Sequence, residues 1–273
     1  MLSVEKGVPM ILWREWLVCV RELRPACART RTFFWMALVL IGLCTRTDLA
    51  GVTSFVRALW LQPRAYRRLL HLFHSPALDL GKLTACWIRL ALRLFRPLRL
   101  GSRPILVADG IKIPKEGRKM PAVKKLFQQS DNNSKPEFIF GHSFEAIGLL
   151  VQGPLGHVAC VPLLSRIHEG LVFSNRDKRT LLDKFVQLFL SIAPLLEQHA
   201  IVVADALYCT QKVIRPLLGT GHHLITRMKS NAVAYRPAQV PPVRRRGRPR
   251  IYGEKLRLRD LWTQTHRFVS ARS

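Results

Sequence analysis

Two aspartates of this chain follow short apolar runs that are typical of buried strands. Residues 105–108 (ILVA) precede Asp109, and residues 201–204 (IVVA) precede Asp205. The tips of adjacent strands in a mixed sheet lie close together, so two carboxylates placed there repel each other unless a cation lies between them. Mg²⁺ is the natural cation, because it takes oxygen ligands and keeps several waters. Held in this way, it activates a water or hydroxyl and stabilises a leaving oxygen on phosphorus.

Each aspartate also has a purely structural interpretation. An Asp after a strand commonly caps a turn or a helix. Asp205 precedes a predicted helix and fits an N-cap, while Asp109 and Gly110 together fit a turn. Residue types and spacing alone leave both interpretations open.

The composition indicates a folded protein that meets a polyanion. Hydrophobic residues make up 48% of the 273 residues, which is enough for a core. The net charge of +27 favours nucleic acid as the partner, with an anionic membrane surface as the weaker alternative. The longest uncharged run, residues 32–45, is shorter than the roughly 20 residues that span a bilayer, so we expect a buried helix there. The cysteines form no C-x-x-C pair, which argues against a zinc ribbon or a redox motif.

The periodicity of the chain divides it into three parts. Residues 1–100 carry apolar residues at helical spacing and predict a helical region, which is either DNA-binding or a plain helical bundle with a basic surface. Residues 101–235 alternate strand and helix patterns, with strands expected at 105–108, 138–152 and 157–165, and predict a mixed α/β sheet. Residues 236–273 are rich in proline and arginine and predict a flexible basic segment.

Several separated motifs resemble one known family. They are residues 107–144, PLLSRIHEG (162–170), VVADALYC (202–209), LITRMKSNAVAY (224–235) and the tail 246–262. In this order they resemble the DDE superfamily endonuclease domain of bacterial insertion-sequence transposases. The resemblance implies an RNase H-like fold in which three acids bind two Mg²⁺ ions, with Mn²⁺ as a substitute, for strand cleavage and transfer. By motif position, Asp109 matches the first acid and Asp205 the second.

The same resemblance implies the partners and the location of the protein. We expect double-stranded DNA at transposon ends as the substrate, leave a homo-oligomer open, and expect no membrane. The implied location is the bacterial cytoplasm, in association with the nucleoid.

The third acid is where the sequence departs from the family. The family's last acid is a Glu on a helix well beyond the second Asp, whereas only Glu254 follows Asp205 here, in a different context. The chain reaches Ser273 before that helix is expected. We therefore expect a C-terminally truncated copy that is inactive alone.

Basic residues supply the candidate DNA contacts. Lys112 and Lys115 follow the first acid and are candidates for phosphate contacts, or belong to a solvated loop. The run RRRGRPR resembles the core of an AT-hook, whose extended arginines enter a narrow A·T minor groove. A basic linker without sequence preference is the alternative. The candidate contacts in this run are Arg244, Arg245, Arg246, Arg248 and Arg250.

Other polar residues near the acids carry weaker hypotheses. His142 lies on a predicted strand beside the first acid, and Glu169, in the SRIHEG motif with Arg166 and His168, is a candidate for approaching metal or DNA; structural roles are the alternative. Two other functions stay open for the whole chain. One is a non-catalytic basic DNA-binding protein, and the other is a different RNase H-like nuclease that acts on RNA or a hybrid.

Overall fold

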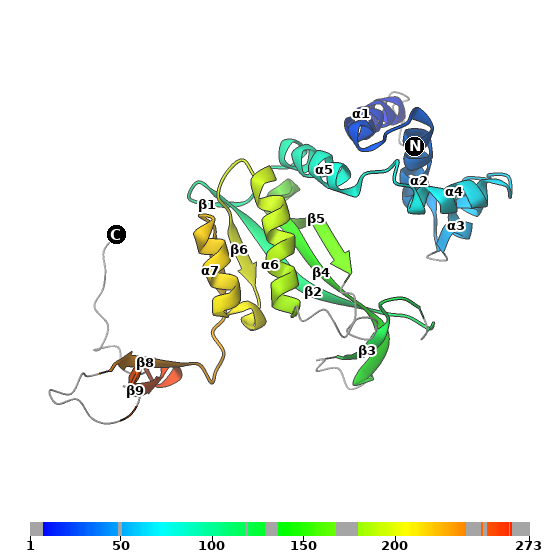
Figure 1. The fold of residues 1–273 in the computed structure, drawn as a ribbon. Helices are drawn as coiled ribbons and strands as arrows, with labels where there is room; N and C mark the ends of the chain where they lie inside the picture. Colours follow the sequence, from blue (N-terminus) through cyan, green and yellow to red (C-terminus); the bar gives the residue numbers. More distant parts are fainter. Residues whose placement is uncertain are drawn as a thin grey trace, which may run out of the picture.

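The computed structural model describes residues 8–48, 51–117, 120–128, 136–167, 180–238, 247, 250–261 and 263. Helices come first along the chain, a mixed sheet flanked by helices follows, and a two-stranded ribbon comes last (Figure 1). The mixed α/β fold with a helical N-terminal region is therefore confirmed.

The N-terminal region is built from five helices. They are α1 (Val8–Glu22), α2 (Thr30–Thr45), α3 (Gly51–Ala58), α4 (Ala65–His74) and α5 (Leu80–Leu94). Asp79 begins α5 as its N-cap, where the side chain accepts a hydrogen bond from the backbone N–H of Lys82 at 2.9 Å. Their apolar faces form two small clusters, one around Met36 and Leu90 and the other around Phe55 and Leu69.

Helix α2 covers the run 32–45, where a buried helix is expected, and only part of its surface is buried. Its buried side comprises Thr32, Met36, Val39 and Gly42, whereas Phe34 is 56% exposed. Met36 packs against α5 and Val39 packs against α3 and α4, and these neighbours leave Phe34 uncovered. Within the described part of the chain, no helix is long and apolar enough to cross a membrane.

Helix α5 joins the helical region to the sheet. Ile88 and Ala91 are fully buried in the core of the sheet, and Trp87 donates a hydrogen bond from Nε1 to the carbonyl oxygen of Pro162 at 2.8 Å. The segment after α5, which the sequence predicts as an irregular boundary, is paired in the structure. The N–H of Leu98 donates to the carbonyl of Leu150 at 2.8 Å, and β1 (Arg99–Leu100) pairs with β2.

The main sheet has the strand order and directions of the RNase H-like fold. Strands β2 (Arg103–Pro114), β4 (Phe138–Gln152) and β5 (Val158–Ile167) are antiparallel neighbours. On the other side of β2, strands β6 (Ile201–Ala204) and β7 (His223–Thr226) run parallel to it and to each other. The spatial order is β5-β4-β2-β6-β7. A parallel neighbour requires a crossover connection, and α6 (Leu181–Ile192) and α7 (Gln211–Gly219) lie in those connections.

Helices α6 and α7 lie side by side against the sheet (Figure 1). Phe185, Phe189 and Ile192 of α6 are fully buried against Leu106, Ile147 and Val202 of the sheet and belong to one large apolar cluster. Thr180 and Asp183 form a capping box at the start of α6, and Lys212 of α7 pairs with the Asp183 carboxylate at 3.2 Å. The pKa of Asp183 is lowered to about 2 by its hydrogen bonds with Thr180 and by Lys212.

Four strands differ from the sequence-based expectation. Strand β2 continues past Ala108 to Pro114, because β4 is long enough to pair with it throughout. Strand β3 (Lys124–Phe127) pairs with the start of β4 inside a predicted loop. Near the C-terminus, β8 (Val233–Pro237) and β9 (Tyr252–Arg257) form a separate ribbon followed by α8 (Leu258–Leu261), where a flexible segment was predicted at the start of the tail.

Candidate active site

The two aspartates lie on neighbouring strands of the sheet. Strands β2 and β6 are parallel, and their last paired residues are Ala108 and Ala204, which lie opposite each other. Asp109 and Asp205 are the next residue of each strand, and both are exposed. The parallel pairing ends directly before them, so both carboxylates lie at the point where β2 and β6 separate.

Each carboxylate has one oxygen in a local hydrogen bond. Oδ1 of Asp205 accepts from the N–H of Leu207 at 2.8 Å and caps the 3₁₀ turn Ala206–Tyr208. Oδ1 of Asp109 accepts from the N–H of Gly110 at 2.8 Å. Among the described residues, Oδ2 of neither aspartate takes part in a hydrogen bond. The N-cap interpretation of Asp205 is correct, and it leaves an oxygen for another role.

The turn interpretation of Asp109 and Gly110 is wrong. Both residues lie within β2, opposite Ala146 and Glu145 of β4. A turn is absent at this point because β4 offers a continuous antiparallel partner to the chain that leaves the aspartate.

A buried carboxyl group lies beneath the two aspartates. Glu145 of β4 is 2% exposed, and its Oε2 accepts a hydrogen bond from the hydroxyl of Tyr208 at 2.7 Å. Directly opposed residues of an antiparallel pair share a face and successive residues alternate. Glu145 therefore lies on the face of Gly110, which the helices cover, and Asp109 lies on the other face.

Tyr208 connects Glu145 to the turn that begins at Asp205. It is 1% exposed and contacts the ring of Phe185 of α6 edge to face, with ring centroids 4.8 Å apart. Since Tyr208 ends the turn that Asp205 caps, its hydrogen bond ties this turn to β4. The position of Asp205 relative to β2 thus depends on a contact buried in the core.

The electrostatics of the three acids are coupled. Burial, the largest cause, raises the pKa of the Glu145 carboxyl, which is about 7 in the folded chain. The charges of Asp109 and Asp205 also raise this pKa, whereas the hydrogen bond from Tyr208 lowers it. Burial, together with the hydrogen bond and charge of Glu145, raises the pKa of Tyr208. At neutral pH, Glu145 therefore exists partly as a neutral acid.

The donor set fits a hard divalent cation through two carboxylates. Exposed oxygens on adjacent strands are the ligand type that Mg²⁺ takes, with water at the remaining positions. Within the described residues, no group of three or more His, Cys, Asp or Glu side chains is placed to hold a metal ion. Two exposed carboxylates are present here, and Glu145 is buried on the opposite face.

The structure distributes the other candidate residues around this site. Lys112 lies on β2 beyond Asp109 and donates from Nζ to the carbonyl of Phe127 at 2.7 Å. Lys115, just past β2, is half-buried. The two lysines thus lie along the arm formed by β2, β3 and β4.

Three further candidates lie away from the exposed carboxylates. His142 is a buried, hydrogen-bonded histidine, with Nε2 3.0 Å from the carbonyl of Pro121, and lies opposite Ile113. Arg166 lies opposite Glu145 on β5. Glu254 lies on the separate ribbon and pairs with Arg236 at 3.3 Å.

Several predictions fall outside the described residues. They concern His168, Glu169, Arg244, Arg245, Arg246 and Arg248. Arg250 is described and is exposed.

The sequence-based reasoning missed Glu145 and Tyr208. A signal for Glu145 was present, because a Glu within the otherwise apolar stretch of β4 requires a buried partner. Its partner, 63 residues away, could not be read from the sequence.

The chain is similar to known proteins in fold and in sequence. A solved chain described as "Cryo-EM structure of piggyBac transposase synaptic complex with hairpin DNA (SNHP)" aligns at 14% identity and a TM-score of 0.36. The alignment covers 80% of this chain and 45% of that one, so this chain spans less than half the length of its match. No curated protein matches. The model of the family described as DDE superfamily endonuclease matches residues 22–272. With this match over nearly its whole length, and with two aspartates directly after the paired residues Ala108 and Ala204 of adjacent strands in an RNase H-like sheet, the chain belongs to the DDE superfamily endonucleases.

Proposed function

We propose that this chain is a DNA transposase of an insertion sequence, in which Asp109 and Asp205 hold Mg²⁺ or Mn²⁺ against a DNA phosphate. The observation that carries the proposal is the register of β2 and β6, which places the two exposed carboxylates directly after Ala108 and Ala204. Membership of the endonuclease family and the net charge of +27 support a nucleic acid as the substrate.

Different residues of the site have different proposed roles. When bound, the ion supplies charge stabilisation at the attacking and leaving oxygens of the phosphate. Asp109 and Asp205 orient it through their exposed oxygens. Glu145 and Tyr208 fix the turn of Asp205, and Lys112 and Lys115 attract DNA phosphates along the arm formed by β2, β3 and β4.

Strand cleavage requires a third carboxylate beyond these two. Positioning supplies most of the catalysis in phosphoryl transfer, and a second ion without a protein ligand has no fixed position. Among the described residues no third carboxylate joins Asp109 and Asp205, so we expect the 273-residue chain to bind duplex DNA and one divalent ion and to leave transposon ends intact. A non-catalytic DNA-binding protein would also bind duplex DNA and leave transposon ends intact, but it would not bind the ion. Ion binding therefore separates the two functions.

Mn²⁺ binding to the whole chain, measured by electron paramagnetic resonance, tests this proposal. We expect one site that is lost in Asp109→Asn and in Asp205→Asn and kept in Glu197→Gln, whose exposed carboxylate lies beyond α6. Ion binding that survives both aspartate variants would contradict the proposal. Cleavage of an RNA–DNA hybrid, but not of DNA, would assign the chain to another class of RNase H-like nuclease.

The three-part organisation supports the same function. We assign DNA contacts to the helical region 1–100, catalysis to 101–235, and further contacts to the basic segment 236–273. Arg246→Ala with Arg248→Ala is expected to weaken binding to A·T-rich duplex more than to G·C-rich duplex, because extended arginines favour a narrow minor groove. Equal losses on both duplexes, measured by fluorescence anisotropy, would reduce the segment to a basic linker.

A further inference from the structure

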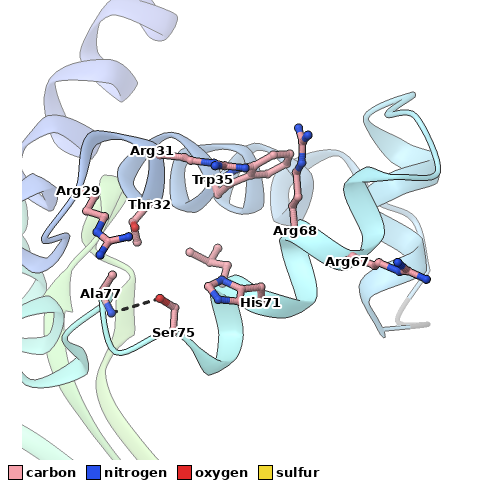
Figure 2. A pocket seen from close by; sticks show the side chains of 10 residues that line it. Arg29, Arg31, Thr32, Trp35, Arg67, Arg68, His71, Ser75 and Ala77 are labelled. Carbon is pink, nitrogen blue, oxygen red and sulfur yellow. Dashed lines mark hydrogen bonds between the residues drawn. The ribbon is translucent and has the colours of Figure 1, made fainter.

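A cavity of about 360 Å³ lies in the helical region, remote in sequence from the aspartates. One wall is the start of α2 and the other is α4, and the chain after α4 closes it (Figure 2). The closing segment is held in place by backbone hydrogen bonds. The N–H of Ala28 donates to the carbonyl of Ala77, and the N–H of Asp79 donates to the carbonyl of Ala26, each at 2.8 Å.

The lining of the cavity is strongly basic. Arg29 and Arg31 come from the α2 wall, and Arg67, Arg68 and His71 come from α4. Among the residues that the structure describes, no acid lines the cavity. The four arginines and His71 are exposed, so water screens the repulsion between their charges, and an anion bound beside them would offset it further.

The carboxylates of the helical region are paired elsewhere. In the described part of residues 8–100, the acids are Glu15, Glu22, Asp48 and Asp79, and their ion-pair partners are Arg14, Arg93, Arg57 and Lys82. None of these basic partners lines the cavity. These acids therefore do not neutralise the lining arginines, whose charge stays available to an external anion.

The start of α2 adds to the positive potential. This helix has 16 residues, its N-cap is Arg29 without a side-chain capping bond, and its first turn contains no acid. The N-terminus of a helix already carries partial positive charge, where acidic or small polar residues are favoured. Arginines at this end are unfavourable for the helix itself and favourable for binding an anion.

The directions of the side chains distinguish an extended anion from a compact one. In Figure 2, Arg29 and His71 point into the cavity, Arg68 extends beside Trp35 at the rim, and Arg67 extends away from the cavity. Groups that bind a single small phosphate converge on one point. Basic groups that continue from a cavity onto the outer surface match a chain of phosphates. The half-buried ring of Trp35 supplies an apolar surface beside them for a sugar or a base.

We propose that this arginine cleft binds the sugar–phosphate backbone of DNA, at a site separate from Asp109 and Asp205. The identification of DNA as the nucleic acid rests on the proposed function. The cleft contributes phosphate contacts and holds the DNA while the sheet acts on another part of it. Arg31 and Arg68 are the principal contacts at the rim, and Arg29 contacts the phosphate that enters the cavity.

Duplex binding by the full chain tests the cleft, with fluorescence anisotropy over a series of KCl concentrations. Each lost phosphate contact lowers the slope of log affinity against log salt by about 0.9. Arg31→Ala with Arg68→Ala is expected to lower the slope by about 1.8 and to weaken binding roughly 10- to 100-fold at about 0.1 M salt. The matched control is Arg14→Ala with Arg57→Ala, which removes the same charge from exposed arginines in ion pairs. Equal losses in both double variants would overturn the proposal.

A second measurement does not depend on the folding of the variants. Hydrogen exchange of the unsubstituted chain is expected to slow at residues 29–35 and 65–77 when a 20-base-pair duplex is added. Protection of these segments by inorganic pyrophosphate but not by the duplex would show a small-anion site instead. The outcome is also independent of the proposed catalysis, because Asp109→Asn removes ion binding and leaves protection of the cleft unchanged.

Discussion

The sheet and the N-terminal helices bury their apolar side chains differently. In the sheet region, one continuous cluster joins α5, α6 and α7 to β2, β4 and β6, and the exposed aspartates lie at its edge. The helices α2 to α4 share smaller clusters, and a cavity walled by arginines lies between them. A continuous core holds a functional group in a fixed position, whereas smaller clusters leave a region more able to open locally. The comparison teaches that the carboxylates are on the rigid part of the molecule and the basic cleft is on the more adaptable part.

Removing a large core side chain from each region gives the largest expected effects. Phe185 of α6 and Leu69 of α4 are both fully buried. Phe185→Ala is expected to lower the free energy of unfolding by about 3–5 kcal/mol, and Leu69→Ala by about 2–5 kcal/mol, through lost burial and the cavity left behind. Thermal unfolding followed by circular dichroism, with hydrogen exchange, checks both values and reports which region opens.

The regional pattern of the two variants decides whether the comparison holds. We expect Leu69→Ala to increase exchange in α2 to α4 and to leave α6 and α7 protected. Uniform loss of protection in both variants would show that α5 couples the regions into one cooperative unit. Phe34→Ala is the control, because this side chain is 56% exposed.

The buried acid of the sheet region predicts a pH dependence of stability. The pKa of Glu145 is about 7 in the folded chain against 4.5 for the free group. Between these values the folded state holds a proton that the unfolded state releases. The contribution of Glu145 is therefore fully present below about pH 4.5 and falls as the pH rises to about 7, by at most about 3 kcal/mol.

Glu145→Gln removes this titration and keeps an oxygen that accepts from Tyr208. We expect the difference in unfolding free energy between this variant and the unsubstituted chain to change across pH 5 to 8, in favour of the variant at high pH. Urea unfolding at each pH gives the measurement. Tyr208→Phe moves the fall to higher pH, because the lost hydrogen bond had lowered the pKa. Parallel pH profiles for all three proteins would refute the assignment.

Helix caps give the smallest expected difference. Asp79 caps α5, which contacts both regions, and Thr180 caps α6 within the sheet region. Asp79→Ala and Thr180→Ala are each expected to cost about 1 kcal/mol, since each leaves a helix N–H without its side-chain acceptor. Denaturant unfolding measures both values. Asp79→Asn retains an acceptor and is expected to lose only a few tenths of a kcal/mol; a loss as large as that of the alanine variant would show that charge, not capping, is the cause.

Local sequence patterns determined much of the fold. The apolar run of residues 138–152 predicted β4 with its observed bounds, and residues 201–204 predicted β6. The helical spacing within residues 1–100 predicted the helical character of this region, which includes α5. The two aspartates were identifiable because a strand pattern followed by a carboxylate is visible within a few neighbouring residues. These features depend on interactions close in sequence, which periodicity and residue type express directly.

Pairing between distant segments decided the rest. Strand β2 extends beyond Asp109 because β4 pairs with it. The segment 96–98 is held by backbone hydrogen bonds to the end of β4. Glu145 is stabilised by Tyr208, which is distant in sequence, and the arginine cleft exists because α4 folds beside the start of α2. In each case the local residues allow several structures, and the one observed follows from which surfaces the collapsed core brings together. The sequence by itself identified Asp109 and Asp205 as candidates. Only the tertiary structure placed the buried carboxyl of Glu145 beneath them and brought the basic residues of α2 and α4 together around one cavity.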